Sequence, residues 1–192
     1  MSALDDAPRV EANDRATWRA WLEANHATSA GAWLVTWRPI SGRLGLDYEA
    51  AVEEALCFGW VDSTAGRVDD ERGKLYFAPR KARSAWSASN KARVARLIAD
   101  GLMAPAGLAV IEAARANGTW EILDSVERLE VPEDLAAALA SRPPAATNFA
   151  AFPASARKQH LAWVATAIRP ETRTRRIAEV ATAAARNERA RG

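Results

Sequence analysis

The densest group of chemically capable side chains lies between residues 80 and 90. Arg80 and Lys81 are followed by Ser84, which is predicted to cap a helix that ends near residue 99. The first turn of a helix presents free backbone N–H groups and the positive end of the helix dipole, and an arginine adds paired donors. This combination is typical of a site for phosphate or another anion. Because no glycine-rich phosphate loop accompanies it, the alternative that Ser84 only caps and the basic side chains are solvated stays open.

The same predicted helix carries polar side chains near or on its apolar face. Trp86 and Asn90 share that face with valine and leucine residues, and Ser87 lies in the first turn. An amide buried among apolar side chains needs hydrogen-bond partners. Asn90 is therefore predicted either to hold the preceding loop in place or to face a pocket.

A second group lies in the sequence CFGWVDS, residues 57–63. Gly59 permits a bulge or a close backbone approach, and Trp60 and Asp62 follow it at the start of a predicted hairpin. Asp62 is expected to pair with Arg80 on the adjacent strand, either as a structural ion pair or as an acid that orients a ligand. The predicted ligand-binding residues are Trp60, Asp62, Arg80, Lys81, Ser84, Trp86, Ser87 and Asn90.

The known catalytic and metal-binding patterns give little support for an enzyme. The chain has no G-x-S-x-G and no H-E-x-x-H sequence, and its two histidines, His26 and His160, are far apart. A single cysteine, Cys57, excludes an internal disulfide and a cysteine-rich zinc site. We therefore expect no cofactor, no metal and no catalysis, with a catalytic group assembled only in space left as an alternative.

The elements that must position these side chains begin with an α/β segment. Hydrophobic periodicity predicts an amphipathic helix over residues 14–24, a strand over 31–38 and a helix over 48–57. Two further strands, 59–69 and 74–80, are joined by a polar turn and form a hairpin. The predicted fold class is α+β, with a small mixed three-stranded sheet, a crossover helix and a hairpin, followed by a mostly helical C-terminal module.

The remainder of the chain is predicted to be helical. Capping residues, prolines and glycines delimit helices over 85–99, 105–116, 133–140, 154–168 and 170–186. The sequence ASRPPAATN at 140–148 is the best candidate linker. The predicted organisation is a flexible N-terminus (1–13), an α/β part (14–140), a helical module (149–186) and a basic tail (187–192).

Tryptophan supplies much of the apolar bulk, since the chain contains eight of these residues. Five of them fall on helix or strand faces that are expected to be core: Trp18, Trp21, Trp33, Trp37 and Trp163. Trp60 and Trp86 instead accompany the candidate ligand-binding side chains, and Trp120 has no assigned role. The sequence thus predicts core bulk and a pocket with two tryptophans.

Charge and hydropathy restrict the compartment and the partners. The N-terminus has no signal-peptide pattern and no segment is apolar enough to cross a bilayer, so a cytoplasmic protein that is not integral to a membrane is expected. The net charge is +2, but residues 80–96 hold six basic and no acidic residues. Residues 157–191 hold nine basic and three acidic residues. Such patches can attract nucleic acid or an anionic membrane surface, although solvated helix faces are the favoured explanation.

Several segments resemble the YdeI/OmpD-associated family, also called the bacteriocin-protection family. The resemblance is carried by CFGWVDS, by PRKARSAWSASNKARVARLIADGLMAPAG, by PEDLAAAL and by FPASARKQHLAWVATAIRPETRTRRIAEV, and it extends over about residues 14–186. Recurring positions in the C-terminal segment are Ser155, Trp163, Thr172, Arg173, Arg176 and Ile177. The resemblance implies an association with protection against bacteriocins or cationic antimicrobial peptides, and it lends no catalytic residue and no cofactor.

The expected function is the non-enzymatic binding of a small anionic or aromatic ligand, or resistance to stress and antimicrobial peptides through a protein partner. Electrostatic binding to nucleic acid or to an anionic membrane is an alternative, and an enzyme of unknown class is a second. Nucleic acid is disfavoured because the tryptophans are predicted to be core rather than stacking platforms. The sequence predicts no oligomeric state.

Overall fold

The structure is a computed structural model that describes residues 6–188. Residues 1–5 of the predicted flexible N-terminus and residues 189–192 of the predicted basic tail lie outside the described part. The chain divides into two compact units: residues up to 84 together with 89–117, and residues 85–88 together with those from 118 onward. Residues 118–140, which the sequence placed with the α/β part, belong to the second unit.

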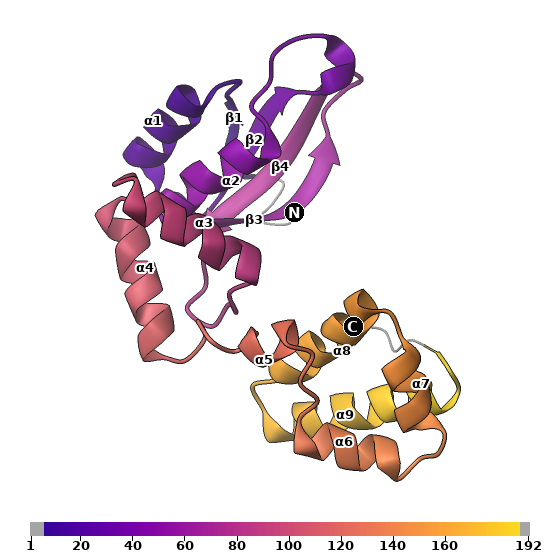
Figure 1. The fold of residues 1–192 in the computed structure, drawn as a ribbon. Coiled ribbons are helices and arrows are strands. Elements are labelled where there is room, and N and C mark those ends of the chain that lie inside the picture. Colours follow the sequence, from indigo (N-terminus) through magenta and orange to yellow (C-terminus); the bar gives the residue numbers. More distant parts are fainter. Residues whose placement is uncertain (1–5, 189–192) are drawn as a thin grey trace. The chain divides into compact units, whose positions relative to one another are not determined.

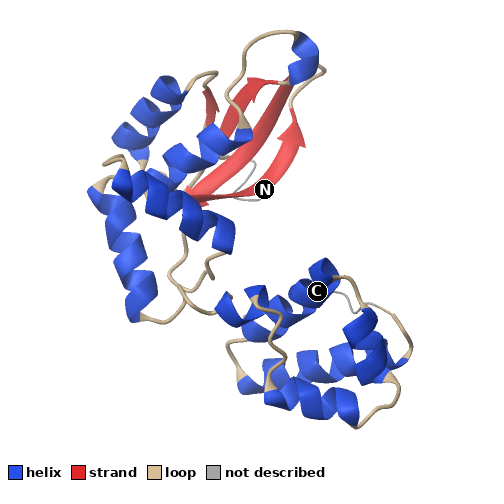
Figure 2. Ribbon diagram, viewed as in Figure 1, coloured by secondary structure: helices blue, strands red, loops and turns tan. Residues whose placement is uncertain are grey.

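The first unit is built on a mixed sheet of four strands rather than the predicted three (Figures 1 and 2). Along the sheet the order is β1-β2-β4-β3, and the bounds are β1 Arg9–Glu11, β2 Ala32–Trp37, β4 Arg72–Pro79 and β3 Trp60–Arg67. β1 is parallel to β2, whereas β4 is antiparallel to both of its neighbours. The additional strand is β1, which lies in the segment expected to be flexible; its three residues are too few to produce a periodic signal.

Two helices cover one face of this sheet, α1 (Arg15–Asn25) and α2 (Tyr48–Cys57). Each is capped by an aspartate at its start: Asp14 accepts a hydrogen bond from the Thr17 N–H and Asp47 accepts one from the Ala50 N–H, both at 2.8 Å. The Trp18 indole is fully buried and donates to the Ala51 carbonyl at 3.1 Å. This contact joins the two helices beneath the sheet.

Two more helices follow the hairpin, α3 (Ala88–Ala99) and α4 (Pro105–Ala116). Pro105 occupies the first turn of α4 as predicted. α3 was predicted to begin at residue 85 behind a Ser84 cap, and this is wrong. Lys81 to Ser84 form a turn instead, closed by a hydrogen bond of 2.9 Å from the Ser84 N–H to the Lys81 carbonyl.

The second unit is a helical bundle (Figure 1). Its helices are α5 (Asp124–Glu127), α6 (Glu133–Ala140), α7 (Ala145–Ala151), α8 (Ala154–Ala165) and α9 (Pro170–Ala185). Leu135, Phe149 and Val180 are among its buried core residues. The expected linker at 140–148 is therefore not a spacer, because it contains the start of α7 and the buried Ala145.

An arginine at one of the recurring positions of the C-terminal segment anchors α9 within this bundle. Arg173 donates to both oxygens of Asp134, at 2.7 and 2.9 Å, and to the Val164 carbonyl at 3.3 Å. Asp134 falls within residues 14–140, which the sequence placed in the α/β part, and the structure assigns it to the second unit together with Arg173. None of the described helices is long and apolar enough to cross a membrane.

Candidate ligand-binding cavity

The eight predicted ligand-binding residues divide between the two units. Trp86 and Ser87 belong to the second unit, and the other six belong to the first: Trp60, Asp62, Arg80, Lys81, Ser84 and Asn90. The anion site was expected because Ser84 would cap a helix whose positive dipole end attracts anions. Ser84 does not begin a helix, so that contribution is missing. That these residues form one site stays a prediction.

Trp60 and Trp86 are both buried core residues. The Trp60 side chain is 1% exposed, donates from Nε1 to the His26 carbonyl at 3.3 Å, and meets Trp21 edge to face. Trp86 is 2% exposed and packs on Trp120, whose ring centroid lies 4.9 Å away. Trp120, which had no role in the sequence analysis, is thereby placed.

The charge of Asp62 acts on the Arg80 guanidinium, and that the two side chains form an ion pair stays a prediction. The Arg80 backbone N–H donates to the Gly59 carbonyl at 2.9 Å, and the side chain is buried. Burial lowers the pKa of Arg80 to about 10, and the charge of Asp62 opposes that shift. Arg80 is therefore protonated at neutral pH.

Two further predicted side chains, Asn90 and Lys81, lie in α3 and in the turn before it. Asn90 accepts a hydrogen bond from Arg93 at 2.8 Å, and Arg93 also binds both oxygens of Glu49 at 2.8 and 2.6 Å. Asn90 thus supports an ion pair that joins α3 to α2. Lys81 is exposed at the surface.

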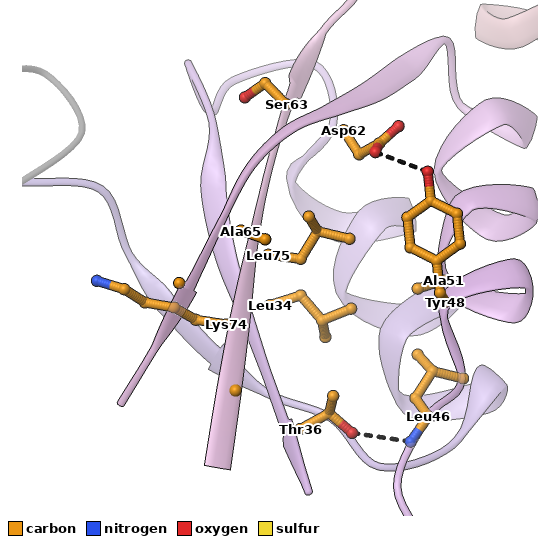
Figure 3. A pocket seen from close by; sticks show the side chains of 12 residues that line it. Leu34, Thr36, Leu46, Tyr48, Ala51, Asp62, Ser63, Ala65, Lys74 and Leu75 are labelled. Atoms are coloured by element: carbon orange, nitrogen blue, oxygen red, sulfur yellow. Dashed lines mark hydrogen bonds between the residues drawn. The ribbon is translucent and has the colours of Figure 1, made fainter. Parts of the chain in front are cut away.

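The first unit holds a cavity between the helix-covered face of the sheet and the start of α2 (Figure 3). Its volume is about 340 Å³. Its lining comes from β2, β3, β4, α2 and the segment before α2: Leu34, Thr36, Leu46, Tyr48, Ala51, Asp62, Ser63, Ala65, Gly66, Gly73, Lys74 and Leu75. Of the residues predicted from the sequence, Asp62 is the one that lines this cavity.

An apolar row across three adjacent strands forms the floor. Leu34 of β2 is paired with Leu75 of β4, and Leu75 is paired with Ala65 of β3. Paired residues on neighbouring strands point to the same face of a sheet, so these side chains form one continuous strip. Ala65 is exposed, and the strip opens to solvent at the β3 edge.

The segment between β2 and α2 forms the wall. The Leu46 N–H donates to the Thr36 hydroxyl at 2.8 Å, which fixes this segment against β2. Gly45 lies so close to the strand that a Cβ atom there would be 2.3 Å from the Trp37 carbonyl oxygen, so the approach requires a glycine. Earlier in the same segment Leu44 is 93% exposed and Ile40 is 78% exposed.

A hydrogen bond between Tyr48 and Asp62 defines the polar end of the cavity. The Tyr48 hydroxyl donates to Asp62 Oδ2 at 2.9 Å (Figure 3). Partial burial, and then the hydrogen bond to Asp62, raise the pKa of Tyr48, which keeps the hydroxyl protonated as a donor. The Lys74 side chain points away from the cavity, and its Nζ lies 4.2 Å from the Trp33 ring centroid on the other face of the sheet.

A second charged cluster joins α1, α2 and α3 and was missed from the sequence. Glu53 and Glu54 are each 5% exposed. Arg15 contacts both, at 2.5 and 3.3 Å, Arg19 contacts Glu54 at 2.8 Å, and Arg96 contacts Glu53. Adjacent glutamates on a helix ordinarily signal a solvated face, and the basic partners come from distant segments.

In the described chain, no group of three or more His, Cys, Asp and Glu side chains could hold a metal ion.

Comparison with protein families divides the chain in a similar place. Residues 10–110, just over half of the chain, match the model of a domain of unknown function, DUF8412. The chain belongs to the DUF8412 family. Residues 128–187 match the family described as bacteriocin-protection, YdeI or OmpD-associated, which confirms the resemblance for the C-terminal segment.

The cavity lies in the DUF8412 part, since its lining extends from Leu34 to Leu75. The sequence CFGWVDS and the segment 79–107 also fall inside the DUF8412 match rather than inside the YdeI/OmpD-associated one. No curated protein and no solved structure matches the chain significantly.

The residues that sequence reasoning missed are the cavity floor and Tyr48. The alternation of Leu34 and Thr36 on one side of the predicted strand was an available signal, as was Tyr48 directly after the Asp47 cap. Neither signal identifies which residues of the other strands lie beside them.

Proposed function

We propose that the DUF8412 part is a non-enzymatic binding module for a small, mainly apolar or aromatic molecule. The observation that supports this proposal is the apolar strip of Leu34, Leu75 and Ala65, which faces a cavity of about 340 Å³ with the Tyr48–Asp62 pair at its polar end. Small-molecule sites usually have volumes of ~300–1,000 Å³, apolar walls and a few placed polar groups.

Binding in this cavity would be driven by removal of apolar surface from water. Each Å² of apolar area buried contributes about 25 cal/mol, so a ligand that covers the strip gains affinity without a catalytic or metal group.

We place this binding in the context of bacterial defence, because the C-terminal part belongs to the bacteriocin-protection, YdeI or OmpD-associated family. In the proposed role, the protein senses or sequesters a small molecule in the cytoplasm under antimicrobial or other stress. The proposal includes a protein partner that recognises the ligand-bound form.

A pair of bulky substitutions on β3 tests the binding module. Ala65→Phe places a ring in the cavity, whereas Thr64→Phe places the same ring at a neighbouring exposed position that does not line it. The full chain and both variants are screened by thermal shift against small aromatic and aliphatic compounds, and hits are verified by native mass spectrometry. We expect compounds that stabilise wild type and Thr64→Phe but not Ala65→Phe. If no compound distinguishes the two variants, the proposed site is wrong.

Electrostatic binding to nucleic acid or to a membrane has weaker support. Several basic side chains of the second unit already pair with acids, as in Lys158 with Glu127 at 2.5 Å and Arg186 with Glu188 at 2.9 Å. Fluorescence anisotropy with duplex DNA at two salt concentrations tests this alternative, since phosphate binding weakens steeply as salt rises.

A further inference from the structure

The polar end of the cavity specifies the chemistry of the ligand head group. Asp62 Oδ2 accepts one hydrogen bond from Tyr48. An ionised carboxylate has two oxygens and about four acceptor sites in all, and it donates none. The Tyr48 hydroxyl donates its hydrogen bond to Asp62, and its oxygen can still accept a hydrogen bond from a ligand in the cavity.

The charges around Asp62 favour a donor over an anion. Of the two charged residues that line the cavity, Lys74 directs its ammonium group to the Trp33 ring on the other face of the sheet. Arg80 interacts with Asp62 and offsets part of its charge, but its side chain is buried and does not belong to the lining. The charges of Arg93 and Glu49 act on the Tyr48 hydroxyl with opposite signs.

We propose that the cavity selects ligands with an aromatic or aliphatic body and a hydrogen-bond-donating head group, an alcohol or an amine, and that it discriminates against carboxylates. The donor binds Asp62 while the body lies along Leu34 and Leu75. This inference rests on the proposed function, and of the small anionic or aromatic ligand expected from the sequence it disfavours the anionic alternative.

The discrimination arises because a donor head group and a ligand carboxylate interact differently with the Asp62 carboxylate. An O–H or N–H donor forms a charge-assisted hydrogen bond with Asp62, which is about twice as strong as a bond between neutral groups. A ligand carboxylate brings a second negative charge to an acceptor that has no proton to share, and like charges in close contact are strongly disfavoured. Because Arg80 offsets part of the Asp62 charge, a neutral alcohol and an ammonium group both fit.

Three probes with the same aromatic body test the inference: 2-phenylethanol, 2-phenylethylamine and phenylacetate. Their dissociation constants for the full chain are measured at pH 7 by NMR titration. We expect the alcohol and the amine each to bind at least about tenfold more tightly than phenylacetate, a ratio that corresponds to ~1.4 kcal/mol. The comparison of alcohol with amine shows which donor the site prefers.

Variants locate the discrimination at Asp62. In Asp62→Asn the amide can donate as well as accept, so phenylacetate should gain affinity and the ratio should fall to about threefold or less. Tyr48→Phe retains the carboxylate and should retain the preference for donors, which covers the case in which Asp62→Asn fails to fold. Asp70→Asn removes the same charge from a side chain that is 94% exposed, and it should leave the ranking unchanged.

The outcomes separate this inference from the proposed function. The inferred preference for donor head groups is wrong if phenylacetate binds as tightly as the alcohol and the amine. It is also wrong if the three probes keep the same order of affinity in Asp62→Asn. In both cases the proposed binding module stands. If wild type binds none of the three probes, both the proposed binding module and the inferred preference for donor head groups are overturned.

Discussion

Replacing Glu54 by glutamine should destabilise the first unit by about 2 kcal/mol. The Glu54 side chain is 7% exposed, and its two oxygens bind different arginines, Arg15 through Oε1 at 3.3 Å and Arg19 through Oε2 at 2.8 Å. A glutamine has one oxygen and one NH₂ group, so in either orientation its NH₂ group faces a guanidinium donor.

The size of this effect follows from the two contacts. A hydrogen bond to a charged group is worth ~1.5–3 kcal/mol, and the variant loses one such bond outright and weakens the other. Both arginines are partly exposed, at 47% and 33% of their side chains, and they regain water when the partner is lost. This solvation holds the loss near the lower end of the range, at about 2 kcal/mol.

Urea unfolding of the full chain measures the loss. With a urea m-value of about 2 kcal/mol/M, the transition midpoint of Glu54→Gln should fall by about 1 M. Hydrogen exchange with mass spectrometry in the same urea series should assign the loss to peptides from α1 and α2 and not to those from α9. Glu112→Gln is the control, because Glu112 is exposed and should change stability by less than about 0.5 kcal/mol. Equal midpoints for the two variants would refute the reasoning.

Three further predictions concern packing, pH and reactivity. Gly107→Ala should destabilise the first unit by about 1–3 kcal/mol, because its Cβ would lie 2.3 Å from the Cys57 carbonyl oxygen; a melting temperature equal to that of wild type contradicts this. Hydrogen bonds from Arg173 lower the pKa of Asp134 from its usual 3.8, so this pair stabilises the fold above that pH and its contribution is lost as the pH falls through the folded-state value. Asp134→Asn should therefore melt lower at pH 7 and lose less stability than wild type between about pH 5 and pH 2, and parallel pH profiles would refute it. Burial raises the pKa of the Cys57 thiol, so a thiol reagent should label it at the unfolding rate, and rapid labelling of the folded protein would be the contrary result.

The helices of the first unit were largely predictable because their signals are local. Asp47 caps α2, and the predicted span of residues 48–57 is the observed one. Pro105 similarly marks the start of α4. In each case a residue at a fixed offset satisfies or avoids backbone donors of the first turn, and no distant contact is needed.

The elements that were missed depend on contacts made far along the chain. β1 has three residues and exists because it pairs with β2, from Arg9 opposite Trp33 to Glu11 opposite Val35. Residues 140–148 resemble a linker in composition, yet α7 forms there because Phe149 is buried in the core of the second unit. Short elements of this kind are stabilised by tertiary packing rather than by their own propensity.

The candidate site shows the same division between local and distant information. Asp62 was found because an acid after a Gly-Trp pair at a hairpin start is conspicuous in the sequence. The cavity floor requires Leu34, Leu75 and Ala65 to share one row across three strands, which depends on the register of two pairings and on the irregularity between Asp62 and Ala65. The expected anion site depended on a helix that begins at residue 85 behind a Ser84 cap, and the helix begins three residues later, at Ala88.

The central claim is that a small molecule binds between the sheet and α2, and chemical-shift mapping tests it most directly. Titration of the ¹⁵N-labelled chain with 2-phenylethanol should shift the backbone amide signals of Gly66, Gly73 and Leu75, which line the cavity. The same titration of Ala65→Phe should leave these signals in place. Shifts confined to residues 80–90, or shifts that persist in Ala65→Phe, would contradict the assignment of this cavity as the binding site.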